Sequence, residues 1–290
     1  MMKKTAWTFV AVAAILWGTM GIWVRGLNEY GLNTMDIVAW RSVGTALCMG
    51  GGLFFYNRSL LKIKWKDLWC FLGTGIASIL FFNYCYFKSI EITDLSTAAV
   101  LLYTSPIFVV LISAVCFREK ITKQKVCAVV LAVAGCALVS GGGQESGALN
   151  AAGILTGLGA GLGYALYSIF SRFALQKGYH TLTITFYTFL VAGIAMVFYL
   201  PFGGLKSSLL LQPGFWTMSA GLILVVTVAA YVLYTYGLAG MENGKAAVIA
   251  TVEPVTAAVL GIFFYQETLT ISGAVGIITV LISGWLVSRE

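Results

Sequence analysis

Long apolar segments follow one another along almost the whole chain, and only short polar stretches separate them. About 20 consecutive apolar residues are enough for a helix to cross the hydrocarbon core of a bilayer. The pattern therefore predicts an all-α integral membrane protein with ten transmembrane helices. The predicted spans are residues 5–24, 34–56, 67–87, 96–117, 124–140, 151–171, 181–201, 214–236, 245–265 and 270–288.

The pattern of the first half returns in the second half. The stretch that ends at Thr122 aligns with the stretch that ends at Thr270 at an offset of 148 residues. An offset of 147 pairs Arg25 with Arg172, at the ends of the first span of each half. Residues paired by these two offsets are termed twins. The twins include Ala98 and Ala246, Pro106 and Pro254, and Glu119 and Glu267.

Each half holds five predicted spans, and a repeated unit with an odd number of spans must lie upside down relative to its copy. The sequence therefore predicts two inverted five-helix repeats, residues 1–140 and residues 151–290. The glycine-rich residues 141–150 between them are predicted to be a flexible linker. Inverted repeats are typical of secondary transporters, in which the substrate site lies near the midplane between the repeats.

Composition and the placement of charge support a membrane protein. Hydrophobic residues make up 59% of the chain and charged residues 10%, whereas a soluble domain has about 25% charged residues. With a cytoplasmic N-terminus, every Lys and Arg falls on the cytoplasmic side except Arg25, Lys88, Lys206 and the intramembrane Arg41. This bias predicts a multi-pass protein of the cell membrane with both termini in the cytoplasm. The net charge of +7 is thus a topology signal, and no nucleic-acid partner is expected.

Groups that carry catalysis are scarce in this sequence. The only histidine is His180 in a predicted loop, and no paired carboxylates, HExxH motif or Cys/His cluster occur. We therefore expect no enzyme, no cofactor and no bound metal. The six cysteines all fall inside predicted helices, where they are expected to be free packing residues.

Glu253 lies near the middle of the ninth predicted span. A charge at that depth costs at least about 2.5 kcal/mol on insertion scales and usually faces a cavity or a partner. We expect either a carboxylate that titrates or contacts substrate, or a neutral acid held by a neighbouring helix. Its twin is Ser105, so the carboxylate itself is not repeated.

Pro106 and Pro254 are twins in the middle of the fourth and ninth predicted spans. Each removes a backbone donor and disturbs the preceding helical turn. Helix breaks at matching places in the two halves are a pointer to a transport site, although a tolerated kink would have the same sequence. We count both prolines among the candidate substrate-binding positions.

Arg41 lies one to two turns into the second predicted span. It is a candidate to bind a carboxylate or phosphate. The alternative is snorkelling to the outer interface near Asp36. Lys88 and Glu91 are one turn apart near the outer end of the third span. This pair is either a simple interfacial ion pair or part of a gate.

Aromatic residues make up 14% of the chain, and several tyrosines fall inside spans. A hydroxyl at that depth needs a partner, so some of these residues are expected to line a wet cavity while others pack in the core. The twins Trp17 and Tyr164, and Tyr86 and Tyr234, are the favoured pairs. The aromatic candidates for substrate binding are Trp17, Tyr86, Tyr103, Tyr164, Tyr187 and Tyr234.

Two further patterns carry structural expectations. Gly153, Gly157 and Gly161 form consecutive GxxxG steps that allow close helix contact, either within the protein or between two copies. Glu119 and Glu267 close the fourth and ninth spans in matching turns, and we expect each to cap the helix that follows.

The first span with LWGTMGIWVRG, the Ser-Pro and Glu-Pro helices and the REKIT and QETLT turns together resemble EamA-type members of the drug/metabolite transporter superfamily. The resemblance implies that four helices of each half surround a central cavity. The fifth and tenth helices, which contain Leu131 and Val280, would form a scaffold at one side. Small multidrug relatives use a glutamate in their first helix, which this chain lacks in its first and sixth spans.

The expected function is therefore secondary-active export of a small metabolite, such as an amino acid or related polar solute, by alternating access. The expected partners are this solute and the lipid bilayer, with Glu253 as the candidate for proton coupling. A homodimer is left open. The alternative is a lipid-linked carrier flippase or a membrane assembly subunit. A channel is disfavoured because inverted halves with symmetric helix breaks suit alternating access.

Cysteine accessibility tests the predicted topology. A cysteine placed within residues 141–150 should react with an impermeant reagent from outside the cell. A cysteine placed within residues 59–65 should react only from the cytoplasmic side, because the positive-inside rule puts it there. The reverse pattern would contradict the repeat.

Overall fold

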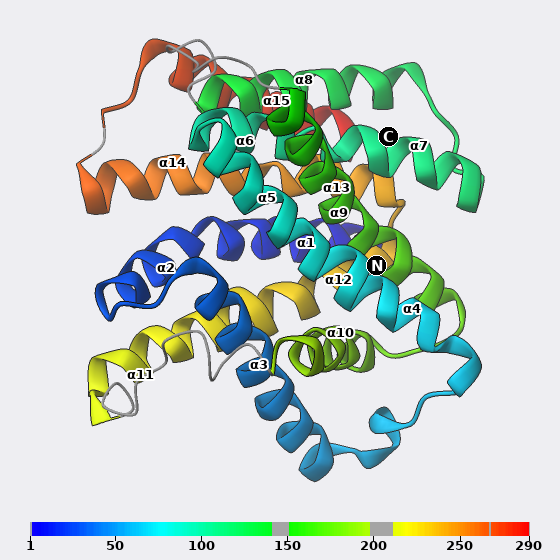
Figure 1. The fold of residues 1–290 in the computed structure, drawn as a ribbon. Coiled ribbons are helices and arrows are strands. Elements are labelled where there is room, and N and C mark those ends of the chain that lie inside the picture. Colours follow the sequence, from blue (N-terminus) through cyan, green and yellow to red (C-terminus); the bar gives the residue numbers. More distant parts are fainter. Residues whose placement is uncertain (1, 141–150, 198–210, 267, 290) are drawn as a thin grey trace.

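The computed structural model describes residues 2–140, 151–197, 211–266 and 268–289, and helices are the only regular elements among them. The long helices run across the view of Figure 1, stacked on one another. One end of the bundle carries α2 and the C-terminal end of α14, at the left of the figure. Because Arg25 lies there, it is called the Arg25 end, and the opposite end is called the Arg172 end.

The helices of each half follow in the same order. The first half contains α1 (Met2–Gly18), α2 (Met20–Glu29), α3 (Thr34–Tyr56), η1 (Arg58–Leu61), η2 (Trp65–Asp67), α4 (Leu68–Leu72), η3 (Gly73–Leu80), α5 (Phe81–Ile92), α6 (Leu95–Leu102), α7 (Ser105–Phe117) and α8 (Lys123–Val139). The second half contains α9 (Ala151–Gln176), α10 (Thr181–Met196), α11 (Pro213–Ala220), η5 (Gly221–Ala229), α12 (Ala230–Gly240), α13 (Asn243–Ala250), α14 (Val252–Tyr265) and α15 (Ile271–Ser288).

Eight helical stretches among the described residues are long and apolar enough to cross a membrane. They are Thr5–Glu29, Thr34–Tyr56, Trp65–Ile92, Leu95–Phe117, Ala151–Gln176, Pro213–Gly240, Asn243–Tyr265 and Ile271–Ser288. Each coincides with one of the ten predicted spans. The two others correspond to the shorter helices α8 and α10, so their crossing of the membrane stays a prediction. The linker 141–150, Lys206 and Glu267 lie outside the described residues.

Twin residues begin and end the helices in the same way. Thr122 accepts the amide of Lys125 at the start of α8, as its twin Thr270 accepts the amide of Gly273 at the start of α15. Such side-chain caps satisfy amides that have no partner in the first helical turn. Figure 1 places both helices along one edge of the bundle.

Left-handed backbone also occurs at twin positions. Arg118 ends α7 with φ 57° and its twin Gln266 ends α14 with φ 54°. The glycine twins Gly31 and Gly178 both have φ 84°. A conformation that non-glycine residues adopt rarely thus recurs at a constant offset, which supports a structural repeat.

Each half also contains a π-helical segment at the same place, Gly73–Leu80 in the first and Gly221–Ala229 in the second. A Cβ on Gly73 would lie 2.3 Å from the ring of Phe170, and a Cβ on its twin Gly221 would lie 2.1 Å from the ring of Trp23. Phe170 and Trp23 are themselves twins. The absence of a side chain therefore lets the first helix of each half approach the third helix of the other half.

The helices that contain Pro106 and Pro254 are broken at matching places. α6 ends at Leu102 and α7 begins at Ser105, while α13 ends at Ala250 and α14 begins at Val252. Each proline lies in the first turn of the second helix, where its missing N–H removes no helical hydrogen bond. The predicted breaks are confirmed, with the prolines at helix starts rather than in helix interiors.

The first helix of each half is packed into the other half. α1 contacts α12, α13 and α14, and α9 contacts α5, α6 and α7. Gly153 approaches Thr93, and Gly157 and Gly161 approach Leu101, so the GxxxG steps serve contacts within the protein. The central core lies where these helices cross, with Val10, Trp17 and Tyr234 almost fully buried.

α8 and α15 pack along each other at the edge of the bundle (Figure 1). Gly135 and Gly276 lie in this contact. A Cβ on Gly276 would lie 2.7 Å from the carbonyl oxygen of Gly135, so the two backbones touch. The position of this pair agrees with the scaffold role that the resemblance implies for the fifth and tenth helices.

A valine at Gly276 should destabilise the protein, because its side chain would force α8 and α15 apart. Overpacking costs about 1–3 kcal/mol. We expect the apparent melting temperature in detergent to fall by about 5 °C. The matched control is Gly284→Val on the same helix, where a Cβ meets no atom within 4 Å. Equal melting temperatures for the two variants would contradict the close contact.

Candidate functional site

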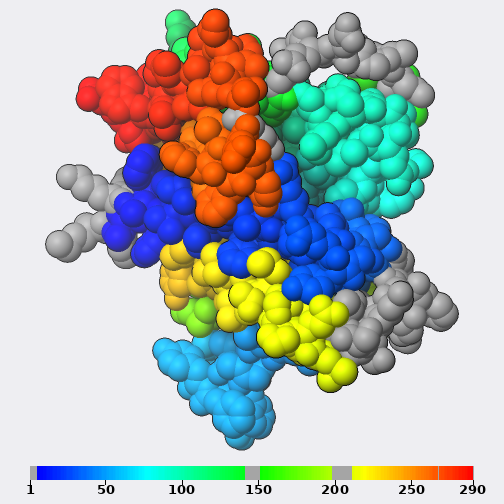
Figure 2. Space-filling view, turned by 90° about the vertical axis from the view of Figure 1, so that its left-hand side faces the viewer, coloured from blue at the N-terminus to red at the C-terminus, as the bar shows by residue number. Residues whose placement is uncertain are grey.

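A cavity of about 550 Å³ opens at the Arg25 end. It lies between the α1–α2 segment, the α5–α6 segment, the end of α8, and α14, which meet on the face of the molecule shown in Figure 2. The breaks α1–α2, α6–α7 and α13–α14 all contribute residues next to it. The lining residues are Gly18, Gly21, Ile22, Arg25, Tyr86, Leu95, Ser96, Ala99, Tyr103, Val139, Ser140, Pro254, Ala257, Ala258, Leu260, Gly261 and Tyr265.

Small side chains create much of this space. The wall formed by α1, α2 and α14 carries Gly18, Gly21, Ala257, Ala258 and Gly261. Their twins at the Arg172 end are Ala165, Ser168, Val109, Val110 and Ser113, and all of these are buried. The protein thus has open volume at one end and packed side chains at the equivalent positions of the other.

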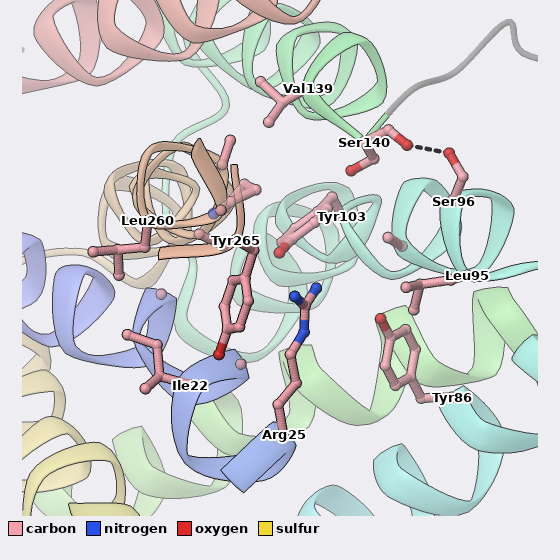
Figure 3. Close-up of a pocket in the computed structure, with 17 residues that line it drawn as sticks. Ile22, Arg25, Tyr86, Leu95, Ser96, Tyr103, Val139, Ser140, Leu260 and Tyr265 are labelled. Carbon is pink, nitrogen blue, oxygen red and sulfur yellow. Dashed lines mark hydrogen bonds between the residues drawn. The ribbon is translucent and has the colours of Figure 1, made fainter. Parts of the chain in front are cut away.

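Arg25 is the cationic group of the cavity. Figure 3 shows its side chain extending from α2 into the space between Tyr265 and Tyr86, with Tyr103 on the opposite wall. The guanidinium carbon lies 4.0 Å from the centroid of the Tyr265 ring, a cation–π contact. At the rim the Ser96 hydroxyl donates to the Ser140 carbonyl. The cavity therefore combines a positive charge with hydroxyl groups and aromatic faces.

Glu253 lies next to this cavity, between the lining residue Pro254 and the α1 helix. A Cβ on Gly18, which lines the cavity, would lie 2.8 Å from the Glu253 carbonyl oxygen. The carboxylate accepts a hydrogen bond of 2.9 Å from the Tyr164 hydroxyl and is partly exposed. The twins Trp17 and Tyr164 have ring centroids 6.1 Å apart. This arrangement holds the deep acid in a hydrogen bond with the protein, one residue before Pro254 of the cavity lining.

Below the cavity the aromatic side chains form a packed cluster. Trp17 contacts Tyr231 and Tyr234, with ring centroids 5.1 and 5.0 Å apart. The Tyr234 hydroxyl shares a 2.7 Å hydrogen bond with Ser168, and the Tyr167 hydroxyl shares one of 2.9 Å with Thr235. Only about 20 Å³ remains open among them. Of the two roles expected for the tyrosines, Tyr234 therefore packs in the core, whereas its twin Tyr86 lines the cavity.

The predicted site residues separate into three groups. Tyr86, Tyr103 and Pro254 line the cavity. Trp17, Tyr164, Tyr234 and Glu253 lie directly beneath it. Pro106, Tyr187 and Arg41 lie elsewhere: Pro106 is buried at the start of α7, and the Tyr187 hydroxyl donates to the Leu61 carbonyl beyond the end of α3.

Arg41 is buried within the helix bundle, with 4% of its surface exposed. Asp36 is not its partner, because that carboxylate accepts the Asn33 amide in the capping box of α3. Among the described residues, the Nε and Nη2 atoms of Arg41 have no hydrogen-bond partner, and Nη1 lies 3.9 Å from the Met20 sulfur. Its burial shows that the snorkelling alternative is wrong, and within the described part of the chain Arg41 is a buried cation without a carboxylate partner.

The Arg172 end is closed by a polar network. Both Glu119 carboxylate oxygens accept backbone amides at the start of α13, from Asn243 at 2.8 Å and from Gly244 at 3.3 Å. The Lys125 ammonium, only 1% exposed, lies 2.8 Å from Glu242 and 3.9 Å from Glu119. The expectation that Glu119 caps the next helix is wrong, since Thr122 fills that role and Glu119 caps a helix of the other half.

Arg172 adds two hydrogen bonds to this closure. Its Nε donates to the Asn243 side-chain oxygen at 2.8 Å, and its Nη2 donates to the Met241 carbonyl. Lys88 and Glu91 form an exposed ion pair of 2.9 Å on α5, as the simpler of the two alternatives for them predicts. All six cysteines are free thiols.

The site residues that sequence reasoning missed are Arg25, Tyr265 and the Lys125 network. The pairing of Arg25 with Arg172 by the repeat is a signal in the sequence. Its position at the end of a span, however, is also typical of an ordinary charge at the membrane interface. Nothing in the local sequence of Lys125 indicates burial, because its partner Glu242 is 117 residues away.

Helices of membrane-spanning length and an aromatic cavity with one cationic residue at one end are typical of a multi-pass membrane protein of the transporter type. The chain belongs to the EamA-like transporter family, whose model matches residues 4–141 and again residues 151–289. An uncharacterized transporter of Archaeoglobus fulgidus is 27% identical over 97% of this chain and 95% of its own length. The uncharacterized transporter YwfM of Bacillus subtilis is 26% identical over 97% and 92%.

The fold is shared with a solved structure. A crystal structure of another protein superimposes with a TM-score of 0.82 over 98% of this chain and 96% of that chain. The two sequences are 15% identical, so the likeness concerns the fold alone. The family match to each half separately agrees with the twin features of the backbone.

Proposed function

We propose that this protein is a secondary-active transporter of a small polar metabolite that works by alternating access. In this proposal ten spans form two inverted halves, residues 1–140 and 151–290, and the cavity at the Arg25 end is one side of the path. The observation that carries it is the asymmetry of the repeat. Twin positions form an open cavity at one end and a packed, hydrogen-bonded closure at the other. Inverted halves that exchange these roles would expose a midplane site to each side in turn.

The charge distribution supports an orientation in the cell membrane. Arg118, Lys120 and Lys123 lie at the Arg172 end, beyond α7 and at the start of α8. By the positive-inside rule this end faces the cytoplasm, both termini are cytoplasmic, and the cavity opens to the outside. The state described here is then outward-open, the state in which an exporter releases its solute.

The cavity favours a solute that carries both charges, such as an amino acid or a related zwitterion. Arg25 in the cavity wall is suited to a carboxylate, and Glu253, next to the lining residue Pro254, is suited to an ammonium group. The rings of Tyr86, Tyr103 and Tyr265 lie along the walls and offer apolar contact to a side chain. A volume of about 550 Å³ is within the range of small-molecule sites.

A lipid-linked carrier is less well supported. A wholly apolar groove of about 490 Å³ does exist between α7 and α8, lined by residues such as Ile107 and Val130. It shares no lining residue with the cavity at the Arg25 end. A flippase would need a polar chamber continuous with such a groove, so the small-solute reading is preferred.

A ligand-stabilisation screen, followed by flux in proteoliposomes, tests the function. Amino acids should raise the melting temperature of the purified protein, because a bound ligand stabilises the folded state. Purines, sugars and cationic drugs are the comparison set. Stabilisation by none of these classes and no flux would contradict the proposed function.

Arg41 gives a second test. It does not line the cavity, but its Nη1 atom lies 3.9 Å from the sulfur of Met20, which precedes the lining residue Gly21. We propose that its buried positive charge acts on the solute path, so Arg41→Ala should reduce the flux of carboxylate solutes about tenfold and Arg41→Lys should restore it partly. Unchanged flux in both variants at equal expression would exclude this role.

Glu253→Gln tests coupling. The amide keeps the size and the hydrogen bond from Tyr164 but cannot release a proton. If Glu253 carries the coupling proton, the variant should fold and bind solute, and its flux should no longer respond to a pH gradient. Tyr164→Phe, which removes the donor but leaves a titratable carboxylate, should keep the response. A Glu253→Gln variant that still follows the pH gradient would exclude this carboxylate as the coupling group.

A further inference from the structure

The cavity at the Arg25 end has a closed counterpart inside the same molecule. Twins of the lining residues Gly18, Ile22, Leu95, Ala99, Ala257 and Val139 are Ala165, Ile169, Asn243, Ala247, Val109 and Val287. Each of these six twins is at most 3% exposed, except Ala247 at 6%. A smaller pocket of about 210 Å³ at this end is lined by Val287 but by none of the other five twins. The Arg172 end therefore shows how these five positions pack without a cavity.

At the closed end Arg172 joins α9, the first helix of the second half, to the start of α13. Arg172 lies near the end of α9 and donates to the Asn243 side chain and to the Met241 carbonyl, at the start of α13. Asn243 is fully buried, and its backbone N–H donates a hydrogen bond to the Glu119 carboxylate. A guanidinium with two acceptors in a region of low dielectric makes strong hydrogen bonds. This contact holds α9 against α13.

At the open end the twin arginine makes a different contact. Arg25 lies over the Tyr265 ring of α14, on the wall of the cavity. The twin of Met241 is Thr93, which precedes α6, and Leu95 at the start of α6 lies across the cavity. Asp94 lies between Thr93 and Leu95, and hydrogen bonds from the Thr97 hydroxyl and amide hold its pKa below its ordinary value. The Thr93 carbonyl thus stands where the closed end has the Met241 carbonyl, and the Asp94 carboxylate lies one residue before Leu95, the twin of the second acceptor Asn243.

We propose that Arg25 and Arg172 are paired gate residues that close the two ends in alternation. In the state seen here Arg172 latches α9 to the start of α13. When the Arg25 end closes, Arg25 leaves the Tyr265 ring and donates to the Thr93 carbonyl and the Asp94 carboxylate at the start of α6. The Arg172 latch opens in the same transition. This inference rests on the proposed function, and it assigns the residues that set the balance between its two states.

In this exchange Arg25 has a partner in both states, the Tyr265 ring when its end is open and the acceptors at the start of α6 when it is closed. A cation–π contact to an aromatic ring and a hydrogen bond to a charged group are of comparable strength. Two states of similar free energy are what a population shift by a solute requires. Removal of one latch should therefore shift the balance toward the opposite state, about tenfold for a free energy of 1.4 kcal/mol.

Two cysteine reporters read the state of each end without knowledge of the solute. Ala99→Cys lies in the open cavity, and its twin Ala247→Cys lies in the closed end. The full chain is placed in nanodiscs, where a water-soluble maleimide reaches both ends. The labelling rate of each reporter is measured above that of the chain with its six native cysteines. The ratio of the two rates reports the balance of states.

Arg172→Met should raise labelling at Ala247→Cys and lower it at Ala99→Cys, a shift in the ratio of about tenfold. Arg25→Met should shift the ratio in the opposite direction. If Arg172→Met does not fold, Asn243→Leu serves in its place, since it removes one acceptor and installs the residue found at its twin position, Leu95. Lys88→Met is the matched control. Lys88 is a basic residue at the same end as Arg25, and it forms an exposed ion pair with Glu91.

The outcomes separate the gate from the transport proposal. Opposite shifts in Arg25→Met and Arg172→Met, with Lys88→Met unchanged, support paired gates. If Ala247→Cys reacts in the unaltered background but neither arginine variant moves the ratio, the gate assignment is wrong and alternating access stands. If Ala247→Cys reacts in no background, including Arg172→Met, the Arg172 end does not open and the alternating-access function itself is contradicted.

Discussion

The first helix of each half packs against the other half, and most of the structure depends on this exchange. α1 lies against α12, α13 and α14, and α9 lies against α5, α6 and α7. Gly73 and Gly221 permit the approach by leaving room for Phe170 and Trp23. Because hydrocarbon cannot solvate open backbone, the helix breaks near Pro106 and Pro254 must lie against protein or a wet cavity. The exchanged helices cover one break on each side.

The cavity owes its chemistry to differences between halves that share one backbone. Gly18 and Gly21 leave space where Ala165 and Ser168 fill it. Glu253 stands where the first half has Ser105, so the two halves differ at this position near the middle of a span. The two halves thus share one backbone arrangement, and the residues that differ between them produce the cavity at the Arg25 end with its charged group.

Much of the helical architecture could be predicted from the sequence, since hydropathy and caps are local. The span 34–56 matches α3 because Asn33 and Asp36 form a capping box at its start. The third helix runs past its predicted end to Ile92, because the Lys88–Glu91 pair extends it beyond the apolar run. The candidate site was predicted in part: Tyr86, Tyr103 and Pro254 line the cavity, whereas the orientation of Arg25 depends on Tyr265, which is distant in sequence. Glu119 was misassigned because the amides that it binds are 124 residues away.

The exchange of first helices also has a consequence for biosynthesis. α1 is translated before the helices that cover it, and these are made only when synthesis has passed Ala230. Until then Trp17 and the glycine-lined face of α1 must lie against lipid or an insertion factor rather than against their final neighbours. The nascent first half therefore lacks part of its core, which forms only when α12, α13 and α14 have been translated. Truncation before α12 would leave α1 without its packing surface.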